Sequence, residues 1–115
     1  MSIGRVRTRS AFRTLRQHGR RARSGALVVT FTPPEPGDPA ETCVAFAIGR
    51  PIGTAVVRNR VRRRLRAAVA ELGPPAGNYL VGATTAVARA SYAELRDDLA
   101  RAFDQLAVPT NEVAR

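Results

Sequence analysis

The sequence predicts an α+β fold, a two-layer sandwich in which helices cover a small mixed sheet. Three observations support this prediction. Segments 26–32 and 42–48 are rich in strand-forming residues and flank a proline-rich loop, and a third such segment follows at 78–84. A long amphipathic segment, 55–72, lies between the second and third of these strands. The predicted order is α-β-β-β-α-β-α if the first sheet stretch contains two short strands, and α-β-β-α-β-α if it is one hairpin.

The chain begins with a basic tail and a short helix. Residues 1–9 show no helical or strand pattern and are expected to be loose. Ser10 is the expected N-cap of a helix over residues 11–18, and Gly19 is its expected end. Residues 20–24 contain three arginines and are expected to be a basic linker that leads into the first strand.

Periodicity defines the strands and the last helix. In the second strand, Val44, Phe46 and Ile48 alternate with smaller residues and therefore share one face. Further along, Ser91 and Glu94 form a capping box that starts a C-terminal helix. The apolar residues of that helix recur at helical spacing and predict a core face, which consists of Tyr92, Leu95, Leu99, Phe103 and Leu106.

The segment 55–72 is the most informative because its amphipathic pattern coincides with a run of arginines. Six arginines fall within the nine residues 58–66. The apolar side chains form one stripe, which consists of Val57, Val61, Leu65, Ala68, Val69 and Leu72. Arginines this close repel one another, and at i,i+4 spacing they destabilise a helix. A polyphosphate backbone would remove that cost, so the segment is predicted to bury its stripe and to bind nucleic acid through its arginines.

The remaining charge also indicates a nucleic-acid partner. The formal net charge is +10, and all 19 basic residues are arginine. Residues 1–34 hold eight arginines and no acid, and residues 42–70 hold seven and no acid, whereas residues 71–115 hold four arginines and six acids. Positive charge confined to two blocks is typical of a nucleic-acid-binding surface, and guanidinium groups bind phosphate in a bidentate geometry.

Length and cysteine content exclude several other classes of protein. Residues 1–115 are predicted to form one domain, with loose ends at 1–9 and 109–115. Cys43 is the only cysteine, which excludes an intrachain disulfide and favours a reducing compartment, so a cytoplasmic protein is expected. The apolar runs are too short to cross a membrane, and no membrane partner is expected.

The sequence predicts neither catalytic residues nor metal ligands. His18 is the only histidine and has no identifiable partner for general acid–base catalysis. The acids Glu94, Asp97 and Asp98 lie on one helix and are interpreted as its solvated face. A protein nuclease would need carboxylates that converge on Mg²⁺, which this distribution of acids does not supply.

One stretch resembles the signature of a known family. It reads VAFAIGRPIGTAVVRNRVRRRLRAAV, which is a strand, a basic glycine turn and an Ala-Val-x-Arg-Asn-Arg core leading into a basic helix. This signature is similar to that of the bacterial ribonuclease P protein subunit. The similarity extends to Phe12, to His18-Gly19, to Asn78-Tyr79-Leu80-Val81 and to the segment from Ser91 to Leu99. It therefore covers nearly the whole domain.

The resemblance implies a function and partners. The family protein is the non-catalytic subunit of an endoribonuclease whose catalytic component is an RNA. The holoenzyme requires Mg²⁺ and removes the 5′ leader of precursor tRNA. The implied partners are therefore the ribonuclease P RNA subunit and precursor tRNA, with no obligate protein partner and no cofactor bound by the protein itself. The family fold also has a left-handed crossover through the basic helix, whereas crossovers in general are right-handed.

The resemblance also assigns residues to two RNA surfaces. The residues implied to bind the catalytic RNA are Arg58, Asn59, Arg60, Arg62, Arg63 and Arg66. A cleft between the first helix and the sheet is implied to hold the leader. Its residues are Phe12 and Phe46, as stacking surfaces for bases, and Arg13 and Arg50, as phosphate contacts.

The sequence departs from the family pattern at several positions, and two rival functions remain. Gly49-Arg50-Pro51 replaces the usual Ser-Lys-Lys, and Arg16 replaces a second aromatic on the first helix. One rival is a general or ribosomal-type RNA-binding protein without a role in tRNA processing. The other is a DNA-binding module, which is disfavoured because Asn59 is the helix's only side chain suited to reading adenine.

Overall fold

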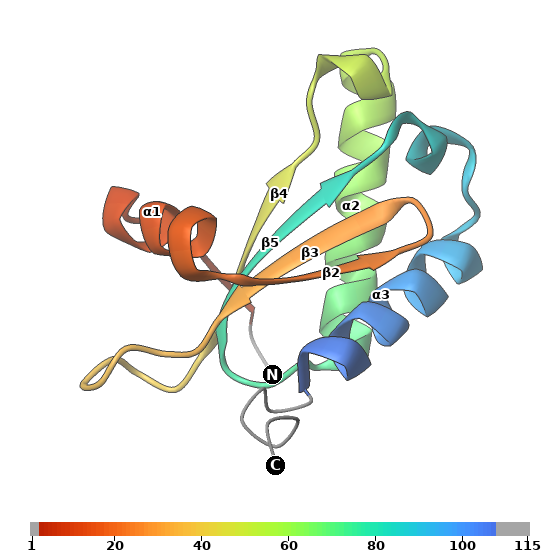
Figure 1. Cartoon of the computed structure of the whole chain (residues 1–115). Helices are drawn as coiled ribbons and strands as arrows, with labels where there is room; N and C mark the ends of the chain where they lie inside the picture. Colours follow the sequence, from red (N-terminus) through yellow and green to blue (C-terminus); the bar gives the residue numbers. More distant parts are fainter. Residues whose placement is uncertain (1–2, 108–115) are drawn as a thin grey trace.

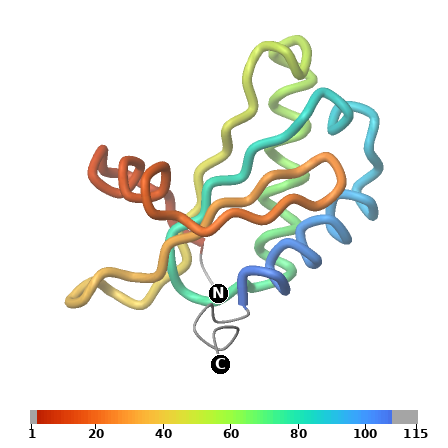
Figure 2. Tube along the Cα trace, in the orientation of Figure 1, coloured from red at the N-terminus to blue at the C-terminus, as the bar shows by residue number. Residues whose placement is uncertain are grey.

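A computed structural model describes residues 3–107. In this part of the chain, five strands form one mixed sheet in the order β1-β4-β5-β3-β2, with helices on both faces (Figures 1 and 2). The elements are β1 (Gly4–Arg5), α1 (Arg9–His18), β2 (Arg20–Ser24), β3 (Leu27–Thr32), β4 (Thr42–Ala47), the 3-10 helix η1 (Arg50–Ile52), α2 (Ala55–Leu72), β5 (Gly77–Ala83), the 3-10 helix η2 (Thr85–Arg89) and α3 (Tyr92–Ala107). The predicted α+β class is confirmed. None of the helices described is long and apolar enough to span a membrane.

Both edges of the sheet differ from the sequence prediction. Residues 20–24 form β2, paired antiparallel with β3, rather than a linker. The three successive strands of the predicted α-β-β-β-α-β-α order are present, but the additional strand is β2 and not a division of the stretch 26–32. Gly4–Arg5, which lies in the segment predicted to be loose, pairs in parallel with β4. Both strands depend on their partners, since β1 is too short to show a pattern and β2 is mostly arginine. The predicted loose tail 109–115 lies outside the described residues.

Helix α1 begins earlier than the sequence predicts. Its N-cap is Thr8 rather than Ser10, and the Thr8 hydroxyl accepts a hydrogen bond from the backbone N–H of Ala11 at 3.0 Å. A helix needs a side-chain acceptor for the free backbone N–H groups of its first turn, and Thr8 supplies it two residues upstream of Ser10. The helix ends before Gly19, as predicted. Leu15 of α1 is fully buried, although this residue is not part of the main core cluster.

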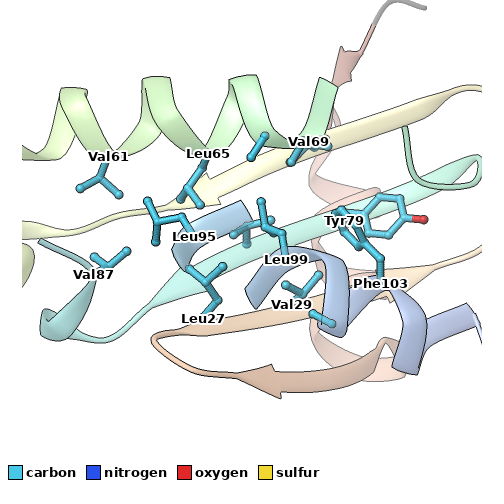
Figure 3. Close-up of a cluster of buried hydrophobic side chains, with 14 of the residues drawn as sticks. Leu27, Val29, Val61, Leu65, Val69, Tyr79, Val87, Leu95, Leu99 and Phe103 are labelled. Atoms are coloured by element: carbon cyan, nitrogen blue, oxygen red, sulfur yellow. The ribbon is translucent and has the colours of Figure 1, made fainter. Parts of the chain in front are cut away.

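The main core lies between the sheet and the helices α2 and α3 (Figure 3). Helix α2 contributes Val61, Leu65, Ala68 and Val69, and α3 contributes Leu95, Leu99, Ala102, Phe103 and Leu106. The sheet contributes chiefly Leu27, Val29, Val44, Tyr79 and Val81. The predicted apolar stripes of both helices are thus confirmed at their centres, while the end positions Val57, Leu72 and Tyr92 are only partly buried. Burial of this face leaves the arginines of α2 on the outside.

Helix α2 connects two parallel neighbours, β4 and β5. In Figure 1 the chain rises along β4, descends through α2 behind the sheet, and rises again along β5 to the right of β4. This crossover is left-handed, as the family resemblance implies, and is an exception to the general rule. It places the start of α2 next to the carboxyl end of β4, so Arg62 of the helix reaches the carbonyl of Ile48.

Asp98 is buried, with 8% of its surface exposed, rather than part of a solvated helix face. Its carboxylate accepts hydrogen bonds from the backbone N–H of Ala26, at 3.4 Å, and from the guanidinium of Arg101. A side chain at Gly25 would collide with the same carboxylate. Asp98 therefore fastens the β2–β3 turn to α3, which is a structural role. The predicted capping box of Ser91 and Glu94 is confirmed by reciprocal hydrogen bonds.

Candidate nucleic-acid interface

The outer side of α2 carries all six residues predicted to bind the catalytic RNA. We call this set the α2 cationic surface, and it comprises Arg58, Asn59, Arg60, Arg62, Arg63 and Arg66. Asn59, Arg63 and Arg66 are exposed, and the other three are half-buried. Among residues 3–107, none of these arginines has a carboxylate oxygen within 4.0 Å, because the ion pairs present involve only Arg96 and Arg101. The positive charge of the surface is therefore not neutralised within the described protein.

Neutral groups hold two arginines of α2 in place. The guanidinium of Arg62 donates to the side-chain oxygen of Asn59 at 3.0 Å and to the carbonyl of Ile48 at 2.9 Å. Arg64, on the flank, donates to the carbonyl of Ala90 at 3.4 Å. Carbonyl acceptors orient a guanidinium without cancelling its charge. Asn59 thus acts within the protein by positioning Arg62.

Arg58 and Arg60 make fewer contacts within the protein. Their Nε atoms are buried and have no hydrogen-bond partner among the described residues. Buried donors are normally paired, and leaving one unpaired costs roughly 1–3 kcal/mol. Among the described residues, the Nε atoms of Arg58 and Arg60 thus lack internal partners such as those that hold Arg62.

The second candidate surface lies between α1 and the sheet face opposite α2. A side chain at Gly19, at the end of α1, would collide with the methyl group of Thr30, which shows that α1 covers this face at Thr30. Beyond α1 the face is lined by partly or fully exposed residues, several of them small: Val28, Ala45, Ala47, Leu80 and Gly82. On α1, Phe12 is half-buried and Arg13 is exposed. The arrangement is an open platform beside an aromatic and a cation.

The structure does not bring Phe46 and Arg50 to this platform. Phe46 is paired with Val81, whose side chain belongs to the main core, so Phe46 points to the α2 side of the sheet. There the guanidinium of Arg66 lies 5.6 Å from the centre of its ring. Arg50 is in η1, at the end of β4 away from α1 (Figure 1). The prediction that Phe12 and Phe46 flank one cleft is therefore wrong. Alternation along a strand shows which residues share a face, but it does not show which helix covers that face.

A separate pocket beside the start of α1 contains acidic residues. A pocket of about 380 Å³ beside the start of α1 is lined in part by Asp38, Glu41, Arg7 and Cys43. Burial and the neighbouring Glu41 carboxylate raise the pKa of the Cys43 thiol, and the thiol donates to Glu41 at 3.7 Å. A protonated thiol is a weak nucleophile, so this geometry gives Cys43 no activation. Within residues 3–107, no cluster of three or more His, Cys, Asp or Glu side chains could hold a metal ion.

The structure adds cationic residues that sequence reasoning assigned to a tail and a linker. Arg21 and Arg23 lie on β2 and point to the same sheet face as α1, because Arg21 pairs with Thr30. Arg5 lies on β1 at the opposite edge. The alternation in Arg21-Ala22-Arg23-Ser24 is the one signal of β2 in the sequence, and it is weak because the two buried residues are small. For Arg5 the sequence contains no comparable signal.

Among residues 3–107, an arginine helix without carboxylate partners lies on one side of the sheet and a partly uncovered sheet face lies on the other, and both are features of the class of RNA-binding proteins. The family model for Ribonuclease P matches residues 3–107. The chain is 40% identical over 116 residues to the ribonuclease P protein component of Thermobifida fusca, which covers 94% of this chain and 79% of the relative. It is 36% identical over 110 residues to that of Acidothermus cellulolyticus, covering 93% and 91% of the two chains. The chain belongs to the ribonuclease P protein family.

Solved structures show the same fold. The RNase P protein of Staphylococcus aureus superimposes with a TM-score of 0.79 at 16% identity, covering 90% of this chain and 95% of that one. The RNase P protein of Thermotoga maritima, solved in complex with 1-(4-fluorophenyl)-2-thiourea, gives a TM-score of 0.73 at 21% identity, covering 84% and 94%. At these identities the agreement concerns the fold, and it includes the arrangement of the sheet and helices.

Proposed function

We propose that this protein binds the catalytic RNA of ribonuclease P through the α2 cationic surface and assists removal of the 5′ leader from precursor tRNA in the cytoplasm. The observation that carries the proposal is an arginine helix without carboxylate partners among the described residues, in a chain of this family. A structured RNA supplies the phosphates that such a surface requires. In this proposal the protein is the non-catalytic subunit and the RNA carries the chemistry, with Mg²⁺ as the holoenzyme's metal.

The leader is proposed to lie on the platform between α1 and the open sheet face. Phe12 provides a ring for stacking with an unpaired base, and Arg13 provides charge for the adjacent phosphate. Arg21 and Arg23 extend positive charge along the same sheet face. An unpaired leader has no duplex shape to read, so stacking and electrostatic attraction are the interactions available to bind it.

Cleavage of precursor tRNA tests the function as a whole. At low Mg²⁺, the chain is expected to stimulate leader removal by a bacterial ribonuclease P RNA and to cleave nothing when it is alone. Product sizes on a denaturing gel measure both results. Binding of many RNAs without stimulation would favour the general RNA-binding protein instead. Cleavage by RNA-free protein that disappears on substitution of His18 or an acidic residue would contradict the non-catalytic role.

Replacing Phe12 with leucine tests the leader platform. The substitution keeps apolar bulk but removes the aromatic face, so the assembled holoenzyme should lose about 1 kcal/mol or more of affinity for precursor tRNA, roughly fivefold. Mature tRNA lacks the leader and should bind unchanged. Equilibrium binding measures the dissociation constants of both tRNAs, and the quantity compared is the ratio of the affinity for precursor tRNA to that for mature tRNA.

Phe46→Leu is the matched control, because Phe46 lies on the other sheet face. This substitution should leave the ratio of the affinities for precursor and mature tRNA unchanged. Equal weakening of both tRNAs by Phe12→Leu would mean that Phe12 acts through folding. If Phe12→Leu leaves both affinities unaltered, the leader lies elsewhere, and the basic strand β2 is the next candidate.

A further inference from the structure

The short strand β1 lies against the edge of the sheet next to α2. It pairs in parallel with β4, and its register matches Arg5 with Val44. Paired residues of neighbouring strands point to the same face of a sheet. Val44 belongs to the main core on the α2 side, so the side chain of Arg5 also points to that side. A residue far from α2 in sequence is thereby brought beside it.

Arg5 lines a shallow pocket together with two arginines of α2. The pocket has a volume of about 210 Å³, and its other charged or aromatic lining residues are Phe46, Arg62 and Arg66. Arg5 and Arg66 are exposed at its rim, while Arg62 is half-buried. None of the described residues that line it is acidic. Three arginine side chains therefore line one small space that is open to solvent.

Two of the three arginines are held in fixed positions. Arg62 is tied to Asn59 and to the carbonyl of Ile48. Arg66 lies over the ring of Phe46, at a distance suited to a cation–π contact. Neither interaction neutralises a charge, and among residues 3–107 no carboxylate oxygen lies within 4.0 Å of these guanidinium groups or that of Arg5. Preorganised and unneutralised guanidinium groups are the arrangement that binds phosphate most strongly.

We infer that β1 completes a phosphate-binding site in which Arg5, Arg62 and Arg66 hold one backbone phosphate of an RNA strand. The inference rests on the proposed function, since it takes the catalytic RNA as the source of that phosphate. Phe46 supports Arg66 and does not itself stack with a base, because the guanidinium already lies over its ring. The N-terminal segment thus forms part of the same RNA interface as α2.

Arg5→Gln tests the site, with Arg7→Gln as the matched control. Arg7 lies two residues further along, carries the same charge and is exposed. Arg5 and Arg7 both line the pocket beside Asp38 and Glu41, but only Arg5 also lines the pocket that contains Arg62 and Arg66. Because Arg62 and Arg66 still contact the phosphate, Arg5→Gln should flatten the slope of log K against log[salt] for assembly with ribonuclease P RNA by up to about 0.7–0.9, the value for one whole phosphate contact, which is up to about five- to eightfold in affinity at 0.1 M salt. Arg7→Gln should change neither quantity. Unchanged melting temperatures confirm that both variants fold.

A double-mutant cycle with Arg66→Gln tests whether the arginines share one phosphate. If they do, the combined loss in affinity should be smaller than the product of the single losses. Multiplicative losses, or equal effects of Arg5→Gln and Arg7→Gln, would overturn the inference. Substitution of Arg58 and Arg60 keeps the two hypotheses separate. If that variant loses affinity for the RNA while Arg5→Gln matches its control, the proposed function stands and the β1 site fails. If neither variant loses affinity, the proposed function fails as well.

Discussion

Replacing Arg58 and Arg60 together by alanine is expected to weaken assembly with ribonuclease P RNA by about 25- to 60-fold at 0.1 M salt. Removal of one phosphate contact should flatten the salt-dependence slope by about 0.7–0.9, and removal of two should flatten it by about 1.4–1.8. Both residues belong to the α2 cationic surface, and the Nε atoms of both lack hydrogen-bond partners among the described residues. The measurement is the dissociation constant of the protein–RNA complex between 0.05 and ~0.4 M monovalent salt.

Arg21→Ala combined with Arg23→Ala is the matched control. It removes the same charge from two exposed arginines at the same sequence spacing, but on β2 and on the sheet face opposite α2. This variant should keep the slope of the wild-type protein for assembly without tRNA. Equal losses of affinity in the two variants would show that net charge, and not the α2 surface, determines assembly. Circular dichroism and thermal melting confirm folding of each variant.

Gly77→Ala is expected to lower the free energy of unfolding by about 2–5 kcal/mol, a large part of the 5–15 kcal/mol typical of a domain. Gly77 begins β5 with φ of +143°, a region that other residues rarely adopt. An added Cβ would lie 2.6 Å from the carbonyl oxygen of Thr32 and would collide with the ring of Phe31. Backbone strain and overpacking therefore act together at the point where β5 meets β3. Urea denaturation measures the change.

Gly37→Ala separates the two causes. Gly37 also has a positive φ, of +93°, but an added Cβ there would have no neighbour within 4 Å. Its substitution should cost only the backbone strain, about 1–3 kcal/mol. If the two variants lose equal stability, the contacts around Gly77 contribute nothing and the packing argument fails. A change in the denaturant m-value would instead indicate an altered denatured state.

The sequence predicted the two long helices better than the edges of the sheet. Each long helix repeats its apolar period over four or more turns, so the stripe centred on Leu65 and that centred on Leu99 were evident from spacing alone. In β2 the arginines at alternate positions conceal a strand whose buried residues, Ala22 and Ser24, are small. Strand β1 has only two residues and exists through its pairing with β4. Tertiary contacts, rather than local preference, determine both edge strands.

The candidate site was predictable in its charge but not in its geometry. The position of Arg63 opposite the apolar stripe follows from helical spacing, and its exposure agrees. By contrast, Phe46 lies on the α2 side because of the order in which the strands pair, which one strand's sequence does not encode. Arg5 is the clearest omission, since the chain must fold before this residue and Arg66 become neighbours.

The two edge strands also affect how copies of this protein behave toward one another. An exposed strand edge can accept a strand from another molecule, and such pairing leads to aggregation unless charge or shortness prevents it. At one edge β1 has two residues, and at the other β2 carries Arg20, Arg21 and Arg23. Mutual repulsion between these edges disfavours strand exchange between copies. The arginines of β2 are therefore expected to oppose association between copies as well as to attract RNA, and lowering the charge of β2 should promote aggregation before it affects the fold.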